Sequence, residues 1–166
     1  METTVSLVQM LDARERRVQH QQALLAQYNK PLICFTMNIC GPVKDSPLIR
    51  RGFARGRQLL RQQFLRAKLV PLREDAIREV TGCEAFYVLD ADPLTIKKFT
   101  TDIEDATPLG RLFDMDVIRP DGRKVDREEL HLEGRRCLIC GGPAKVCSSR
   151  RIHTCLLYTS PSPRDS

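Results

Sequence analysis

PLGRLFDMDVI, residues 108–118, is the segment around which we expect the fold of this chain to be organised. From Leu112 to Ile118 apolar and polar residues alternate, which is typical of a half-buried β-strand. The alternation directs the side chains of Asp114 and Asp116 to one face of the strand. Their Cα atoms are then about 6.6 Å apart, so the two carboxylates can share one divalent cation. Polar side chains on the solvent face of any strand give the same pattern, and that interpretation stays open.

The composition indicates one folded, water-soluble domain. Of the 166 residues, 42% are hydrophobic and 29% are charged. No apolar run approaches the roughly 20 residues of a membrane span, and the N-terminus lacks a signal segment, so we expect a cytoplasmic protein. The formal charge of +6 predicts an acidic partner, which can be nucleic acid, a polyphosphate ligand or an acidic protein. Only 5% of residues are aromatic and Trp is absent, which favours phosphate or protein over single-stranded nucleic acid.

Hydrophobic periodicity predicts a mixed α/β fold around that strand. We expect a single domain with a central sheet of about four or five strands and flanking helices. The predicted helices cover residues 5–28, 47–67 and 93–105, and the predicted strands cover residues 32–39, 85–89 and 112–118. Residues 68–84 show no clear pattern. A nucleotidyltransferase-like sheet is expected by analogy alone, because the Asp-x-Asp strand resembles the metal-binding strand of that superfamily.

Two helices carry features with more than one interpretation. Leu7, Leu11 and Val18 belong to an apolar stripe on the first helix, and we expect this stripe to cover the sheet. The alternative is a helix that binds a partner. Glu104 lies near the C-terminus of the helix before the Asp-x-Asp strand, where a carboxylate is unfavourable for the helix dipole. We therefore keep Glu104 as a candidate third acidic group.

The loop GPVKDSP, residues 41–47, predicts an anion site between a strand and a helix. Asp45 or Ser46 can cap the helix and Pro47 suits its first turn. A helix N-terminus offers free backbone N–H groups and a partial positive charge. The predicted substrate-binding residues are Gly41, Lys44, Asp45, Ser46, Arg50, Arg51 and, next to the Asp-x-Asp strand, Gly110. The alternative is an ordinary capped turn with solvated basic residues, and the P-loop pattern is absent.

The cysteines predict a metal site rather than a disulfide framework. Seven cysteines are an odd number, and we expect a reducing compartment. A Cys-x2-Cys-x6-Cys-x5-His spacing near the C-terminus predicts a structural zinc site, formed by Cys137, Cys140, Cys147 and His153. Reduced, packed or redox-active thiols are the alternative. A basic zinc-knuckle module that binds nucleic acid is therefore a rival function.

Four stretches together resemble one enzyme family. They are GPVKDSPLIRRGF (41–53), TGCEAFYVLDAD (81–92), PLGRLFDMDV (108–117) and RRCLICGGPAKVC (135–147). They resemble the holo-acyl-carrier-protein synthases of citrate lyase, also called apo-citrate lyase phosphoribosyl-dephospho-CoA transferases, over about residues 5–153. The resemblance implies a donor, 2'-(5''-triphosphoribosyl)-3'-dephospho-CoA, and an acceptor serine on the apo acyl-carrier (gamma) subunit. The expected reaction transfers the phosphoribosyl-dephospho-CoA group and releases pyrophosphate.

A mechanism that fits this resemblance assigns the charged residues to the triphosphate. Asp114 and Asp116 are expected to hold Mg²⁺. Phosphate oxygens are expected to be bound by Lys44, Arg50 and Arg51. Arg111 is expected to offset charge at the phosphorus under attack. Such transfers depend on positioning and electrostatic stabilisation, so no protein nucleophile is required.

The chain departs from the family pattern at two places. Thr107 stands where the family usually has His before Pro-Leu-Gly, so a non-catalytic assembly factor is a third candidate function. After Thr154 the chain lacks helical periodicity and contains several turn formers. We therefore expect a transferase domain over residues 1–154 and a non-native or disordered tail over residues 155–166.

Overall fold

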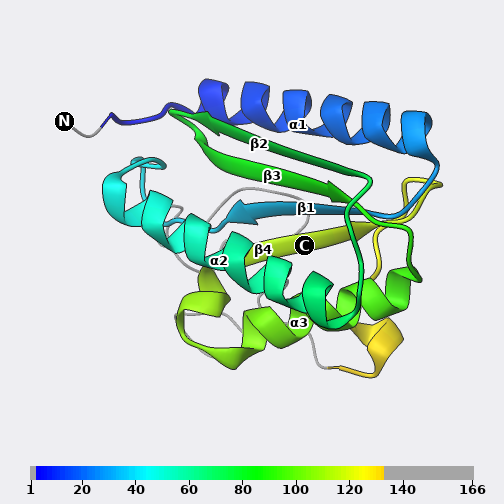
Figure 1. The fold of residues 1–166 in the computed structure, drawn as a ribbon. Helices are drawn as coiled ribbons and strands as arrows, with labels where there is room; N and C mark the ends of the chain where they lie inside the picture. The colour runs from blue at the N-terminus through cyan, green and yellow to red at the C-terminus, as the bar shows by residue number, and fades with distance from the viewer. Residues whose placement is uncertain (1–2, 133–166) are drawn as a thin grey trace.

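In the computed structural model, which describes residues 3–132, three helices enclose a four-stranded sheet (Figure 1). Helix α1 covers one face, and helices α2 and α3 cover the other (Figure 1). The elements in chain order are α1 (Leu7–Tyr28), β1 (Leu32–Met37), α2 (Pro47–Arg66), β2 (Arg73–Glu79), β3 (Gly82–Val88), α3 (Pro93–Ala106), the 3₁₀-helix η1 (Leu109–Leu112), β4 (Phe113–Ile118) and the 3₁₀-helix η2 (Arg127–Leu130). The predicted mixed α/β domain is confirmed. None of the helices in residues 3–132 is long and apolar enough to span a membrane.

The sheet is antiparallel throughout, in the order β2-β3-β1-β4. Thr36 of the central strand β1 lies opposite both Glu84 of β3 and Asp114 of β4. Directly opposed residues of antiparallel strands share one face of the sheet. Glu84, Thr36 and Asp114 therefore form one row, which we call the Thr36 row, near the C-terminal end of β1.

The face toward α2 and α3 holds the larger hydrophobic core. Phe35 and Phe113 are fully buried there, and α2 packs on them through the face that its periodicity predicts. Gly56 permits this close packing, because a Cβ at this position would lie 2.4 Å from Cζ of Phe35. Ser46 begins α2, since its Oγ accepts a hydrogen bond from the backbone N–H of Ile49 at 3.2 Å. Of the two predicted caps, Ser46 is the N-cap.

Helix α1 covers the opposite face with only part of the predicted stripe. Its buried residues are Ala13, Arg17, Gln21, Leu24 and Leu25. Leu7, Leu11 and Val18 are 63%, 47% and 42% exposed. The prediction that the N-terminal half of the stripe covers the sheet is therefore wrong.

Charged residues on the sheet explain which side of α1 is buried. Arg17 Nε donates to Glu84 Oε2 at 2.6 Å, and His20 Nε2 lies 2.9 Å from Asp75 Oδ2. A covered carboxylate needs a polar or charged partner, since burying it alone costs several kcal/mol in free energy. The polar side of α1 supplies these partners, and Leu7 and Leu11 near its N-terminus are exposed.

Strand β2 lies in the stretch for which the sequence showed no pattern. Its sequence is REDAIRE, in which Ala76 and Ile77 are the two apolar residues. β2 is an edge strand with largely exposed side chains, and it pairs through its backbone with all seven residues of β3. An edge strand of this kind needs no apolar alternation. The predicted strand 85–89 began too late, since β3 covers Gly82–Val88.

Glu104 covers part of the outer edge of β4. Glu104 Oε2 accepts a hydrogen bond from the backbone N–H of Met115 at 3.0 Å, and Oε1 lies 2.8 Å from Nη2 of Arg127. Within residues 3–132 no three His, Cys, Asp or Glu side chains are grouped so that they could hold a metal. Glu104, the candidate third acidic group, therefore does not form a three-carboxylate metal group with the two aspartates. Its carboxylate closes a strand edge and pairs with an arginine.

Candidate functional site

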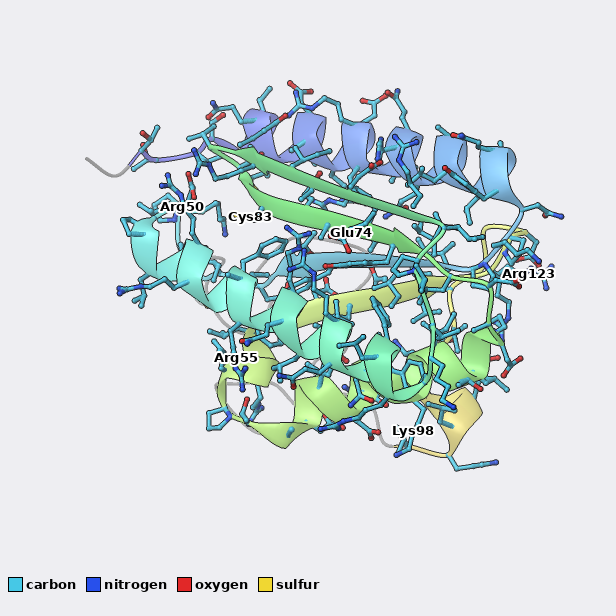
Figure 2. The ribbon with its side chains drawn as sticks, in the orientation of Figure 1. Arg50, Arg55, Glu74, Cys83, Lys98 and Arg123 are labelled. Carbon is cyan, nitrogen blue, oxygen red and sulfur yellow. The ribbon has the colours of Figure 1, made fainter. Side chains whose placement is uncertain are left out.

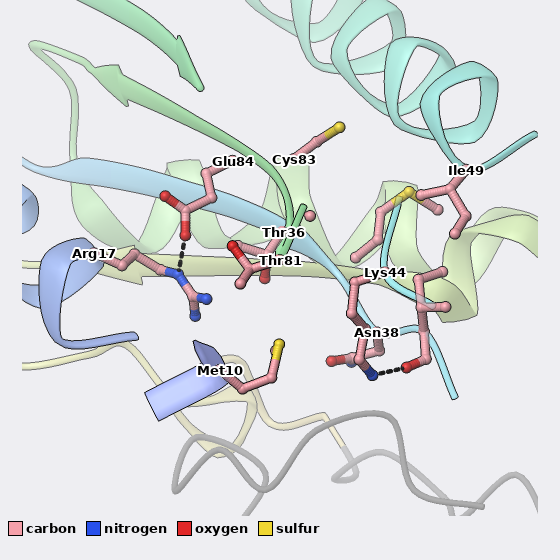
Figure 3. A pocket seen from close by; sticks show the side chains of 12 residues that line it. Met10, Arg17, Thr36, Asn38, Lys44, Ile49, Thr81, Cys83 and Glu84 are labelled. Carbon is pink, nitrogen blue, oxygen red and sulfur yellow. Dashed lines mark hydrogen bonds and ion pairs between the residues drawn. The ribbon is translucent and has the colours of Figure 1, made fainter. Parts of the chain in front are cut away.

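A small pocket lies at the end of the sheet where β1 stops (Figure 3). α1, the start of α2 and the turn between β2 and β3 surround it. Its polar lining residues are Arg17, Thr36, Asn38, Lys44, Thr81 and Glu84. The cavity volume is about 30 Å³, which is room for about two water molecules. Only one end of a ligand therefore enters it.

Arg17 and Glu84 form a buried ion pair on one side of this pocket. Their side chains are 10% and 14% exposed, and Nε of Arg17 donates to Oε2 of Glu84 at 2.6 Å (Figure 3). The pair joins α1 to β3. Because a single Nε–Oε2 bond holds the guanidinium, its two terminal nitrogens extend beyond Glu84 toward the pocket (Figure 3).

Lys44 lies on the other side of the pocket from Arg17 (Figure 3). Its Nζ donates a hydrogen bond to the backbone carbonyl of Ile39, which holds the side chain against the end of β1. Burial lowers the pKa of Lys44 below its ordinary value of 10.5, and the neighbouring Cys40 opposes this shift. Desolvation has this effect because it disfavours the charged ammonium.

The lowered pKa of Lys44 predicts an alkaline limit to anion binding. As pH rises from about 7 toward 10.5, Lys44 loses its proton earlier than an ordinary lysine, so an anion held by its charge should bind more weakly. Lys44→Arg should abolish this alkaline loss, since arginine stays charged. The measurement is the dissociation constant for inorganic pyrophosphate against pH in both proteins. Equal pH profiles would contradict the prediction.

The lowered pKa of Lys44 also changes how the folding stability depends on pH. Burial of the charged Lys44 opposes folding while the ammonium is charged, which is the case below the lowered folded-state pKa. This cost disappears as pH rises from that pKa to 10.5, so the contribution of Lys44 to stability increases over that interval. A loss of anion affinity there is therefore not explained by unfolding through Lys44.

Asp114 and Asp116 lie on one face of β4, as the alternation predicts. Asp114 is 6% exposed and belongs to the Thr36 row, so it lies directly beside a residue that lines the pocket. Asp116 is one row further, opposite Cys34, and its Oδ2 is 3.6 Å from Nζ of Lys124. Carboxylate and hydroxyl oxygens are ligands of the kind that Mg²⁺ prefers. The aspartates and Thr36 therefore fit a magnesium ion by their chemistry.

Arg50 does not line the pocket, because Asp45 holds its guanidinium. Nε and Nη2 of Arg50 donate to the two carboxylate oxygens of Asp45, both at 2.9 Å. This hydrogen bonding lowers the pKa of Asp45, which therefore stays ionised. Figure 2 shows Arg50 at the N-terminal end of α2, near Cys83. A phosphate would have to compete with Asp45 for Arg50.

The structure separates most of the predicted phosphate ligands from the pocket. Lys44 lines it, whereas the other predicted residues do not: Gly41, Asp45, Ser46, Arg50, Arg51, Gly110 and Arg111. The Oγ of Ser46 is used in capping α2. Arg51 and Arg111 have exposed side chains, on α2 and η1 respectively. Their roles in catalysis stay predictions.

Gly110 has a packing role that the sequence did not indicate. A Cβ at this position would lie 2.4 Å from the carbonyl oxygen of Ile103 and 2.7 Å from that of Glu104. The backbone N–H of Gly110 donates to Oγ1 of Thr107 at 3.1 Å. The side chain of Thr107 therefore links the end of α3 to η1.

The predicted zinc ligands lie outside the described residues. They are Cys137, Cys140, Cys147 and His153, and the expected tail over residues 155–166 lies there too. The sequence did not single out Arg17, Thr36 or Glu84, although they line the pocket. Arg17 and Glu84 are 67 positions apart, so no local spacing connects them. The predicted apolar stripe did not include Arg17, so no sequence signal indicated that this residue faces the sheet.

Comparisons with known proteins identify the family. A family model described as apo-citrate lyase phosphoribosyl-dephospho-CoA transferase matches residues 5–158. A protein named CitXG from Haemophilus influenzae is 35% identical over 149 residues, which are 90% of this chain and 32% of that relative. Relatives named apo-citrate lyase phosphoribosyl-dephospho-CoA transferase from Citrobacter koseri and Escherichia coli are 35% and 34% identical, over 90% of this chain and 81% of each relative. With most of its length matched in this way, the chain belongs to the apo-citrate lyase phosphoribosyl-dephospho-CoA transferase family.

Proposed function

We propose that this protein transfers the phosphoribosyl-dephospho-CoA group from 2'-(5''-triphosphoribosyl)-3'-dephospho-CoA to a serine of the apo citrate lyase acyl-carrier (gamma) subunit. Pyrophosphate is the second product. Membership of a family with this name supports the transferase activity and the donor. The observation that carries the proposal is the position of Lys44 at the pocket beside the Thr36 row, which ends in Asp114. A cation and a carboxylate at one end of a sheet suit a triphosphate and its metal ion.

The proposed chemistry needs no nucleophile from this chain. The serine oxygen forms a bond to the phosphorus next to the ribose as that phosphorus loses its bond to pyrophosphate, and the hydroxyl proton is released. Asp114 and Asp116 would hold Mg²⁺, which neutralises charge on the triphosphate when bound. Lys44 binds a phosphate oxygen, and its partial burial strengthens that electrostatic attraction. In this mechanism Arg111 offsets charge at the phosphorus under attack.

In this proposal the carrier subunit, which supplies the acceptor serine, binds to the basic surface of α2. Arg57 and Arg61 are held by Glu74, at 2.6 Å and 2.9 Å. Arg51 and Arg55 are exposed on the same helix. We propose that an acidic carrier subunit docks there, in the cytoplasm, and that the cysteines near the C-terminus hold a structural zinc ion.

The test is incubation of the full chain with apo acyl-carrier subunit, donor and Mg²⁺, followed by intact-mass measurement of the carrier. The expected result is a mass increase equal to one phosphoribosyl-dephospho-CoA group and release of pyrophosphate. A nucleic-acid-binding module would instead bind RNA or DNA with an affinity that falls steeply with salt. An assembly factor would bind the carrier without changing its mass. Either of these two results without transfer would refute the proposed activity.

A further inference from the structure

We propose that Arg17, Thr36 and Lys44 form a phosphate-binding subsite in the pocket, in which Glu84 positions Arg17. The ligand chemistry is a phosphoryl group with at least two free oxygens. Its assignment to the donor rests on the proposed function, whereas its binding to the pocket does not.

Thr36 supplies the first step of the argument. Thr36 is 6% exposed and lines the pocket, and among residues 3–132 its Oγ1 has no hydrogen-bond partner. Buried hydroxyl groups are nearly always hydrogen-bonded, because an unsatisfied one opposes folding. A hydroxyl of this kind at a pocket wall indicates a ligand that completes its hydrogen bonding. A phosphate oxygen accepts from a hydroxyl and meets this need.

Arg17 supplies the second step. Its Nε is bonded to Glu84, and in the described part of the chain no other hydrogen bond of its guanidinium is found. The terminal nitrogens face the pocket beyond Glu84 (Figure 3). They offer a planar pair of donors that matches two oxygens of a phosphate. Glu84 fixes the orientation of this guanidinium in advance, which reduces the entropy lost on binding.

Lys44 completes the subsite from the opposite side. Its ammonium is held at the end of β1 by the carbonyl of Ile39, and it lines the same pocket as Thr36 and Arg17. The lining therefore contains two cations and one carboxylate, that of Glu84. The cavity of about 30 Å³ admits one end of a ligand. A single phosphoryl group fits both this size and this balance of charge.

The test measures binding without the metal and without transfer. Full-length protein is titrated in EDTA by calorimetry with inorganic pyrophosphate and, separately, with 3'-dephospho-CoA. Arg17→Lys keeps a cation beside Glu84 but loses the paired donors, so the affinity for the recognised probe should fall about tenfold or more. The matched control is Arg16→Lys. Arg16 is the neighbouring exposed arginine, paired with Glu79 at 2.8 Å, and its variant should bind as the wild type does.

Thr36→Val gives a second test that does not depend on the stability of an ion pair. Valine has nearly the same shape as threonine and removes the unsatisfied hydroxyl. The thermal unfolding midpoint should therefore stay equal or rise, while the affinity for the probe falls about threefold to tenfold. A residue with a purely structural role would not combine an unchanged or higher midpoint with weaker binding.

The two probes show which phosphate group of the donor the subsite binds. Dependence of pyrophosphate binding on Arg17 and Thr36 assigns it to the leaving group, and dependence of 3'-dephospho-CoA binding assigns it to the diphosphate of the CoA portion. Equal affinities in wild type, Arg17→Lys and Thr36→Val for both probes would overturn the subsite, as would absence of binding in the wild type.

The outcomes also separate this inference from the proposed function. Binding that depends on Arg17 and Thr36 in a protein that modifies no carrier would keep the subsite and refute the transferase. Transfer with an unchanged KM for the donor in Arg17→Lys and Thr36→Val would keep the transferase and overturn the assignment of the subsite to the donor.

Discussion

Asp114→Asn should reduce transfer to the carrier subunit by about a hundredfold to a thousandfold, because it removes a carboxylate proposed to hold Mg²⁺. Asparagine has nearly the same shape and no charge, so packing around this buried residue changes little. Asp116→Asn should have an effect of the same order, although it also removes the partner of Lys124. The measurement is the initial rate of the mass increase on the carrier at several Mg²⁺ concentrations.

Asp102→Asn is the matched control for both aspartates. Asp102 is an exposed residue of α3, paired with Lys98 at 2.8 Å, and exposed pairs of this kind contribute little to stability. This variant should transfer at the wild-type rate. A partial recovery of the Asp114 variant at high Mg²⁺ would support a weakened metal site. Full activity of both site variants at every Mg²⁺ concentration would rule out the assignment of the metal to β4.

Gly110→Ala should be strongly destabilising, because the new methyl group would meet backbone atoms. Its Cβ would lie 2.4 Å from the carbonyl oxygen of Ile103 and 2.7 Å from that of Glu104. Backbone at the end of α3 cannot turn aside as a side chain can, so η1 must shift. Overpacking of this kind costs about 1–3 kcal/mol, which lowers the midpoint of thermal unfolding by about 2–4 °C for each kcal/mol in a chain of this size.

Gly52→Ala is the control with the opposite expected sign. A Cβ at Gly52 would lie 3.1 Å from Cε of Met37, which is the flexible end of a side chain. Replacing glycine by alanine inside a helix favours the helix by about 1 kcal/mol, so this variant should be neutral or more stable. Thermal unfolding followed by circular dichroism compares the two. If Gly110→Ala unfolds at the wild-type temperature, the close contact between η1 and α3 does not constrain residue 110.

Features that depend on neighbours in the sequence could be predicted. The alternation around Asp114 and Asp116 placed both on one face of β4. The predicted helices over residues 47–67 and 93–105 are α2 (Pro47–Arg66) and α3 (Pro93–Ala106). Lys44 was predicted as a phosphate ligand and lines the pocket. Each prediction rested on spacing within a few residues, where backbone geometry alone decides which side chains share a face.

Local patterns were thus sufficient to predict the helices, three of the four strands, the aspartate pair and the family resemblance. Tertiary structure alone decided that β2 is an edge strand, that α1 turns Arg17 inward, and that Thr36 lies between Glu84 and Asp114. Whether a side chain is buried depends on which residues pack against it, and these residues are often distant in the sequence. Arg17 lies 67 positions from Glu84, and the pairing of their charges overrides the apolar periodicity of the helix.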